Sequence, residues 1–106
     1  MGYKMKNNVE GLLSGSSPII KKDLGPNVHG ETLNDGTIVI NKRLSPIQQK
    51  LAIKHEKVHR DQIKRGDLSY DENYVYWKGK KYARKSMNEG AKNLPWEAEA
   101  YKKQNK

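Results

Sequence analysis

The segment between Ser45-Pro46 and Gly66 constrains the fold more than any other part of the chain. A serine at the N-cap with proline at the first helical position is a typical helix start, and a glycine that follows basic residues is a typical stop. The sequence therefore predicts a helix over residues 46–65. In a chain of 106 residues, which fits one domain, a helix of this length must supply much of the core.

One stripe of this helix is predicted to face the interior. On a helical wheel, apolar side chains share that stripe with two histidines, and basic side chains lie opposite. The stripe consists of Ile47, Leu51, His55, Val58, His59, Gln62 and Ile63, and the opposite side carries Lys50, Lys57, Arg60 and Lys64. Both histidines therefore fall on the face that is predicted to be buried. Ile53 falls on the basic side, against the pattern.

Two β-hairpins are predicted, one before the helix in the sequence and one after it. The first turns at Asn34-Asp35-Gly36, a turn-forming segment between two strand-like runs, and the second turns at Gly79. The second hairpin is rich in tyrosine and tryptophan, which favour strands. The strands are predicted at 28–33, 37–41, 74–77 and 81–82.

The remaining segments complete an α+β fold. Residues 1–18 mix Gly, Ser, Asn and Lys without periodicity, so we expect a flexible segment there, followed by a single domain over 19–106. Residues 83–92 are expected to form a loop, and a C-terminal helix is predicted to begin near Asn93. The helix over 46–65 is therefore expected to pack on a short sheet and hairpins, with the C-terminal helix beside it.

The long helix carries the sequence His55-Glu56-Lys57-Val58-His59. Side chains four residues apart leave the same face of a helix, so both imidazoles can converge on one Zn²⁺ at about 2.0 to 2.1 Å. Because the chain has no cysteine, any zinc must be held by histidine and carboxylate ligands. Glu56 lies at the edge of the same face. Since zinc lowers the pKa of its bound water to about 7, we predict that Glu56 is the base that takes this water's proton.

A simpler interpretation of these residues needs no metal. His55 and His59 would then be a pair of partly buried, hydrogen-bonded histidines, and Glu56 would be a carboxylate at the solvent edge, paired with Arg60. The pattern His-Glu-x-x-His arises by chance in about a few chains per thousand. Here it lies in the middle of a well-signalled helix, and a second helix that carries carboxylates follows it. This context favours the zinc site.

Glu97 and Glu99 compete as the third metal ligand. In a helix that begins near Asn93, Glu97 lies on the face that can pack inward, whereas Glu99 lies among lysines, where a surface carboxylate gains weak pairing. The inward face carries Leu94, Glu97, Ala100, Tyr101 and Gln104. We therefore predict that Glu97 points at the metal and Glu99 at water. The alternative for Glu97 is a carboxylate at a helix start, where the helix dipole favours it.

HEKVH, followed by Leu-Pro-Trp-Glu-Ala-Glu-Ala from Leu94 onward, resembles the gluzincin arrangement of the zincin superfamily. The run from Gly30 to Gln62, in which a strand ending in Ile-Val-Ile-Asn and a leucine precede the helix with HEKVH, is similar to minimal bacterial and phage metallopeptidase-like domains of the ImmA/IrrE kind. The resemblance covers residues 28–104. It implies a small zincin-like domain, zinc-dependent hydrolysis of peptide bonds, a sheet strand that lines the cleft, and Glu97, in a Glu-x-x-Ala setting with Ala100, as the third ligand.

Two other functions remain open beside a metallopeptidase. One is a zincin-derived binding module with structural zinc, and the other is an amidase or endopeptidase that acts on peptidoglycan. The intact Glu56 favours an enzyme, because a purely structural site does not need it. The group that would stabilise the oxyanion also stays open among six residues. These are His29, Tyr70, Tyr74, Tyr76, Tyr82 and Tyr101.

The charge of the chain bears on its partners. The formal net charge is +9, and most of the surplus lies after residue 44. We expect a protein or peptide substrate, with an anionic partner as a further candidate for the basic surface; a nucleic acid is not expected. No apolar run is long enough for a signal sequence or a membrane span, so we expect a cytoplasmic protein encoded by a bacterium or phage.

Overall fold

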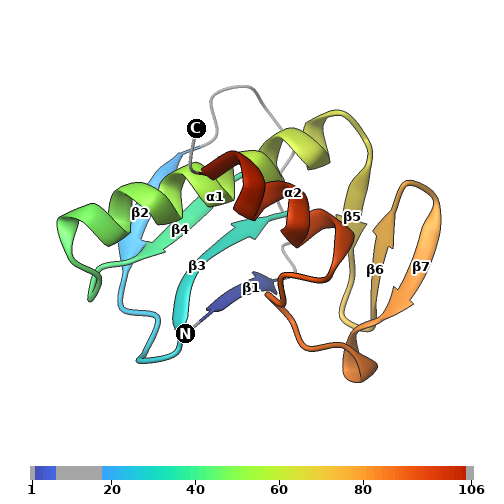
Figure 1. Cartoon of the computed structure of the whole chain (residues 1–106), viewed down its shortest axis with the longest axis horizontal. Helices are drawn as coiled ribbons and strands as arrows, with labels where there is room; N and C mark the ends of the chain where they lie inside the picture. The colour runs from blue at the N-terminus through green and yellow to red at the C-terminus, as the bar shows by residue number, and fades with distance from the viewer. Residues whose placement is uncertain (1, 7–17, 105–106) are drawn as a thin grey trace.

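The computed structural model describes residues 2–6, as backbone, and residues 18–104. In this part of the chain, helices α1 (Pro46–Lys64) and α2 (Pro95–Gln104) lie beside two small sheets, an α+β arrangement as predicted (Figure 1). The strands are β1 (Gly2–Lys6), β2 (Ile19–Lys22), β3 (Val28–Leu33), β4 (Ile38–Asn41), β5 (Leu68–Tyr70), β6 (Tyr74–Trp77) and β7 (Lys80–Ala83), and Arg84–Ser86 forms a short 3₁₀ turn.

The first sheet is built around the predicted hairpin. Strands β3 and β4 pair in antiparallel fashion, and Gly36 closes the turn between them with a positive φ of 89°. β1 and β2 then join in parallel on the outside, which gives the order β1-β3-β4-β2. The sequence did not indicate these two outer strands. The rest of the segment that was expected to be flexible, residues 7–17, lies outside the described residues.

Helix α1 has the ends that its sequence predicted. Ser45 accepts a hydrogen bond from the backbone N–H of Gln48, whose side chain in turn accepts from the Ser45 backbone N–H, and Pro46 occupies the first turn. The helix ends at Lys64, one residue before the predicted end, and Gly66 follows with a φ of 83°. The helix packs against β3 and β4.

The buried face of α1 differs from the predicted stripe at its N-terminal end. Ile47 is 74% exposed and Leu51 is 36% exposed, so the prediction that they face the interior was wrong. Ala52 is fully buried instead, and Ile53, which broke the pattern, packs partly buried against the cluster of Ile38, Ile40, Leu44 and Ala52. The small Ala52 side chain lets the helix approach the sheet closely, and this rotates the buried face toward Ala52 and Glu56.

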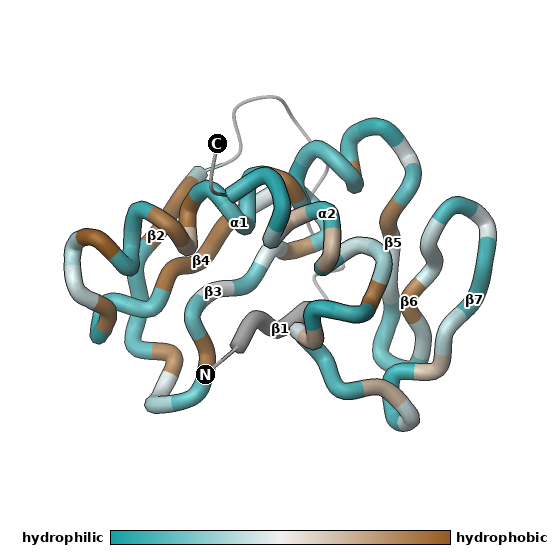
Figure 2. The backbone as a smooth tube through the Cα atoms, viewed as in Figure 1, coloured by the Kyte–Doolittle hydropathy of each residue, from teal (hydrophilic) through white to brown (hydrophobic). Residues whose placement is uncertain are grey.

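The second sheet has the order β5-β6-β7 and packs its own core against α2. The predicted hairpin of β6 and β7 is present, and Lys78 and Gly79 both have positive φ in its turn. β5 was not predicted. This core consists of Leu68, Tyr70, Val75, Trp77 and Trp96, and Figure 2 shows apolar segments on β5 and β6 as well as on β4. Neither described helix combines the length and the apolar character that crossing a membrane requires.

Two hydrogen bonds tie the second sheet to the first. The Asn34 side chain donates to the carbonyl of Tyr70 over 2.9 Å, and the Tyr70 hydroxyl donates to the carbonyl of Thr32. The strand β3, which carries Thr32, is therefore held by β1 and β4 within its sheet, by α1 and by Tyr70.

Gly30 of β3 lies close to both α1 and β4. A Cβ atom added to Gly30 would lie 3.1 Å from the Val39 carbonyl oxygen and 3.2 Å from both Glu56 Cγ and Ile40 Cδ1. These distances are too short for an unstrained contact, so glycine is needed here for space.

We expect Gly30→Ala to lower the free energy of unfolding by about 1–3 kcal/mol, because the added methyl group must push strand and helix apart. Urea denaturation of the two proteins measures this loss. Ser69→Thr, which also adds one methyl group but at an exposed strand position, is the matched control and should change stability little. Equal stability of Gly30→Ala and the parent would show that the strand and helix separate freely.

Candidate metal centre

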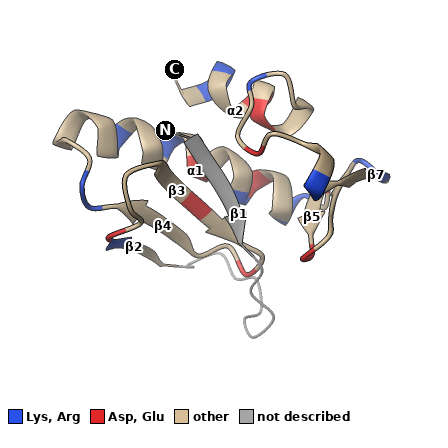
Figure 3. Ribbon diagram, turned by 90° about the horizontal axis from the view of Figure 1, so that it is seen from below, with Lys and Arg blue, Asp and Glu red and all other residues tan. Residues whose placement is uncertain are grey.

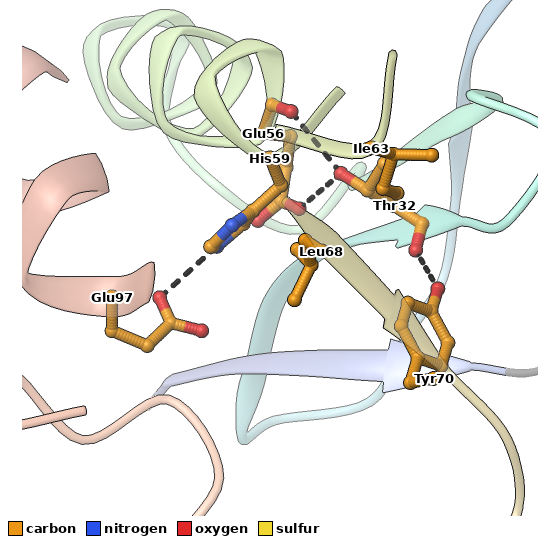
Figure 4. Close-up of a pocket in the computed structure, with 7 residues that line it drawn as sticks. All are labelled: Thr32, Glu56, His59, Ile63, Leu68, Tyr70 and Glu97. Atoms are coloured by element: carbon orange, nitrogen blue, oxygen red, sulfur yellow. Dashed lines mark hydrogen bonds and ion pairs between the residues drawn. The ribbon is translucent and has the colours of Figure 1, made fainter. Parts of the chain in front are cut away.

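The structure brings His55 and His59 of α1 together with Glu97 of α2. His55 Nε2 lies 2.8 Å from Glu97 Oε1, and His59 Nε2 lies 3.1 Å from the same oxygen. All three side chains are buried, and each offers a ligand atom within 4.8 Å of the other two. Figure 4 shows His59 and Glu97 projecting toward each other from the two helices. These are the three residues that the sequence predicted as metal ligands.

The donor atoms fit a tetrahedral zinc ion after a small adjustment. Ligands bound to zinc at about 2.0 to 2.1 Å with tetrahedral angles lie about 3.3 Å apart. The nitrogen–oxygen distances of 2.8 and 3.1 Å are slightly shorter than this, because they are hydrogen-bond distances. The ion would fit if the two histidines and Glu97 moved apart by about 0.2 to 0.5 Å. Two imidazoles and one carboxylate, with a water in fourth place, form a donor set that zinc uses in catalytic sites.

Glu56 lies beside this cluster with one oxygen satisfied and one free of hydrogen bonds. The Thr32 hydroxyl lies 2.6 Å from Glu56 Oε1 and donates to it, whereas Glu56 Oε2 is buried without a partner among the described residues. The side chain is 1% exposed, so it is not the solvent-edge carboxylate of the simpler interpretation. Arg60, the partner suggested there, donates to the Gly36 carbonyl instead. An unsatisfied buried carboxylate oxygen calls for a water, proton or ion.

A small cavity adjoins Glu56, His59 and Glu97 (Figure 4). Its volume is about 10 Å³, which is close to the space that one water molecule occupies. The cavity walls also include Thr32, Ile63, Leu68 and Tyr70. A water in this cavity would border the base candidate Glu56 as well as two of the three ligand residues, His59 and Glu97.

The protonation of these groups depends on burial and on their mutual contacts. Burial raises the pKa of Glu56, against the opposing effects of His59, His55 and the Thr32 hydrogen bond. Burial alone would lower the pKa of His59, but the Glu97 carboxylate outweighs it and raises that pKa to about 9. For Glu97, burial is outweighed by His59 and by hydrogen bonds from both histidines, so its pKa falls to about 2. Without metal, His59 and Glu97 therefore form an ion pair at neutral pH.

The candidates for oxyanion stabilisation are divided by the structure. Tyr70 lines the cavity, and Tyr101 packs edge-on against His55 with ring centroids 4.7 Å apart. The pKa of His29 is lowered, mainly by burial and in addition by the nearby His55. Tyr74, Tyr76 and Tyr82 belong to the second sheet and are not among the residues around the cavity.

The sequence predicted that Glu99 points at water, and this prediction is only partly correct. It forms the expected helix pair with Lys103 at 3.3 Å, but it also accepts hydrogen bonds from Gln62 Nε2 and from Arg65, each over 2.7 Å. The reason is that α2 lies against the C-terminal half of α1, so Glu99 meets Gln62 and Arg65. A helical wheel of α2 alone cannot show this contact.

Three further polar residues around the site were not assigned a role from the sequence. Thr32 holds Glu56, Gln104 lies 2.6 Å from His55 Nδ1, and Gln62 lies 2.8 Å from His59 Nδ1. Gln62 and Gln104 were placed on the inward faces of their helices, and glutamine on a buried face is a signal for such a contact. Thr32 could have been found from strand alternation, which puts it on the same side of β3 as Gly30.

Loss of a residue that only hydrogen-bonds to a metal ligand weakens metal binding by roughly 10- to 100-fold. We expect Glu97→Ala to weaken zinc binding by more than this, because the site loses one of its three protein ligands. Competition with a chromophoric chelator measures the dissociation constant. Glu89→Ala, which removes a carboxylate that pairs with Arg84 away from the site, is the control and should bind zinc as the parent does. Equal affinity in both variants would exclude Glu97 as a ligand.

The stability of the metal-free protein should depend on pH through the His59–Glu97 pair. The raised pKa of His59 contributes stability fully below 6.5 and loses it as pH rises through about 9. The lowered pKa of Glu97 contributes fully above 4.5 and loses it as pH falls toward about 2. Urea unfolding of the chelated parent and of Glu97→Gln should therefore differ most between pH 4.5 and 6.5. A pH-independent difference would show that the two groups are not paired.

No family model matches the sequence, and neither a curated protein nor a solved structure shows significant similarity to it. The contacts of His55, His59, Glu97 and Glu56 therefore carry the functional proposal.

Proposed function

We propose that this protein is a zinc-dependent metallopeptidase in which His55, His59 and Glu97 hold the metal and Glu56 is the general base. The observation that carries the proposal is the free oxygen of Glu56. A site that served only to bind metal would need the three ligands, yet a buried carboxylate with an unpartnered Oε2 lies beside them and beside a cavity of water size. That combination is what hydrolysis by an activated water requires.

Thr32 and Glu56 have separate roles in the proposed hydrolysis. When bound, Zn²⁺ would acidify a water and polarise the carbonyl of the peptide bond. Thr32 donates to Glu56 Oε1 and thereby leaves Oε2 to accept the proton of the attacking water. Burial raises the pKa of Glu56, which makes it a better proton acceptor near neutral pH. Glu56 then passes the proton to the amine nitrogen as the carbon–nitrogen bond breaks.

The burial of the site favours a second candidate, a binding module with structural zinc. His55, His59, Glu56 and Glu97 are each at most 4% exposed, and the adjoining cavity of about 10 Å³ is large enough for a water molecule but not for a peptide. A peptidase would therefore have to open beside this cavity before a substrate carbonyl reached the metal. A structural site would stay closed, and the free Glu56 oxygen would then have no chemical role. Hydrolysis by the zinc-loaded protein distinguishes the two.

The substrate class that we propose is a protein or peptide. The amide bonds of peptidoglycan are the alternative substrate, and the basic surface supports an anionic partner for either (Figure 3). The outer side of α1 exposes Lys50, Lys57 and Lys64, as the sequence predicted, and also Lys54. Arg60, which was predicted on the same side, is half-buried and donates to the Gly36 carbonyl. Binding to nucleic acid is not part of the proposal. A cytoplasmic location in a bacterium or phage host stays a prediction.

We expect Glu56→Gln to keep one zinc per chain and the parent's melting temperature while it loses turnover by about 10²- to 10⁴-fold. Glutamine preserves the shape and still accepts from Thr32, but it cannot take the proton of the water. Zinc is measured by elemental analysis, and turnover by mass spectrometry of a peptide library and of purified peptidoglycan. Glu72→Gln, at an exposed turn, is the control.

Two results would overturn the proposal. Full turnover by Glu56→Gln would exclude Glu56 as the base. Zinc binding by the parent without hydrolysis of either substrate class would favour the structural module.

A further inference from the structure

Each histidine of the centre has a second partner besides Glu97, and in both cases it is a glutamine. His55 Nδ1 lies 2.6 Å from Gln104 Oε1, and His59 Nδ1 lies 2.8 Å from Gln62 Oε1. The Nε2 atoms of the same rings face Glu97. Both imidazoles are therefore held at both nitrogens, and the amide contacts lie on the side of each ring away from the ligand cluster.

The orientation of the Gln62 amide follows from its other contacts. Its Nε2 donates to the Trp96 carbonyl over 3.1 Å and to Glu99 Oε1 over 2.7 Å, and both of these atoms can only accept. The amide oxygen must therefore be the atom that faces His59. Because that oxygen cannot donate, the proton of the contact belongs to His59 Nδ1. In a neutral imidazole, Nε2 then carries the lone pair that a metal needs.

Helix α2 provides the anchors of this arrangement. It carries Glu97, which faces both Nε2 atoms, and Gln104, which faces His55 Nδ1. It also carries Glu99, which fixes Gln62 and is itself held by Arg65 and Lys103. One helix thus orients both rings: Glu97 faces Nε2 of each, and Nδ1 is held directly by Gln104 for His55 and through Gln62 for His59.

We propose that Gln62 and Gln104 are the positioning residues of the metal centre, and that they fix both histidines as Nδ1–H tautomers with their Nε2 lone pairs directed at the metal. This inference deepens the proposed function and rests on its zinc site, although not on peptidase activity. The partners are uncharged amides, whereas carboxylates are frequent in this role and raise the basicity of the ligand. An amide fixes the ring without adding charge, so the bound metal keeps more of its power to acidify water.

The test is zinc affinity, measured by chelator competition. Gln62→Leu and Gln104→Leu should each bind zinc about 10- to 100-fold more weakly than the parent, because the rings are no longer held. Gln104→Glu restores an acceptor for His55 Nδ1 and should recover most of the affinity. Gln49→Leu, which removes an amide at the other end of α1, is the matched control and should bind as the parent does.

Nitrogen-15 NMR of the histidine rings gives a readout that a merely structural role would not move. The zinc-loaded parent should show both rings as Nδ1–H tautomers, because zinc replaces the proton with which each Nε2 faces Glu97 in the metal-free protein. In zinc-loaded Gln62→Leu, the Nδ1–H proton of His59 should exchange faster with solvent than in the parent, because its acceptor has been removed. If Gln62→Leu does not fold, Glu99→Ala decides the role of Gln62, because it removes the anchor and should weaken zinc binding several-fold.

The outcomes separate this inference from the proposed function. A parent protein that binds no zinc would sink both together. Parent-like zinc affinity in both Gln→Leu variants would reject the positioning role and leave the metal site intact. Parent-like affinity in Glu99→Ala would reject the part played by Glu99 and Gln62, while weaker binding by Gln104→Leu with recovery in Gln104→Glu would support the role of Gln104 on its own.

Discussion

The structure depends on one buried carboxylate. Glu97 Oε1 lies within 3.1 Å of the Nε2 atoms of both histidines of α1. This contact joins the two helices at a place where all three side chains are buried. A buried charge without a partner would cost several kcal/mol (roughly), so the folded structure tolerates Glu97 at this place only together with its histidine partners. The same need can be met by protons on the histidines or by a metal ion in their place. Folding and metal binding therefore use the same atoms.

Around this contact the interior is divided into apolar ends and a polar middle. The cluster of Ile38, Ile40, Leu44 and Ala52 lies toward the start of α1, and the cluster with Trp77 and Trp96 lies toward its end. The buried polar residues of α1 between them are His55, Glu56 and His59, and Val58 is the buried apolar residue in this stretch. A chain that is only 34% hydrophobic and has no phenylalanine cannot fill this middle with side-chain carbon alone. The middle is instead ordered by the hydrogen bond that Thr32 donates to Glu56 and by those that Gln62 and Gln104 accept from the histidine rings, so the order of the site and that of the core are linked.

The parts of the fold that the sequence predicted are those fixed by local chemistry. Ser45-Pro46 starts α1 and Gly36 closes the first hairpin, because capping and turn geometry depend on neighbours in the chain. The spacing of His55 and His59, and the phase of Glu97, follow from the helical repeat. Ile47 and Leu51 were misplaced because a wheel ranks positions by hydropathy, whereas the sheet selects the face with the small Ala52. The contact of Glu99 with Arg65, the pairing of β1 with β3 and the pairing of β2 with β4 each join segments that are far apart in sequence. No local sequence pattern indicates such contacts.

The order of the strands has a consequence for the chain during its synthesis. β1 and β2 are made before the hairpin of β3 and β4, yet among the described residues their pairing partners are strands of that hairpin, β3 for β1 and β4 for β2. Neither can find its partner until that hairpin has left the ribosome. Ile19 and Ile20 remain 38% and 41% exposed even in the finished sheet, so a nascent chain presents them on an unpaired strand throughout this interval. The two lysines that complete β2, Lys21 and Lys22, place positive charge next to this apolar pair and oppose its association with other nascent chains.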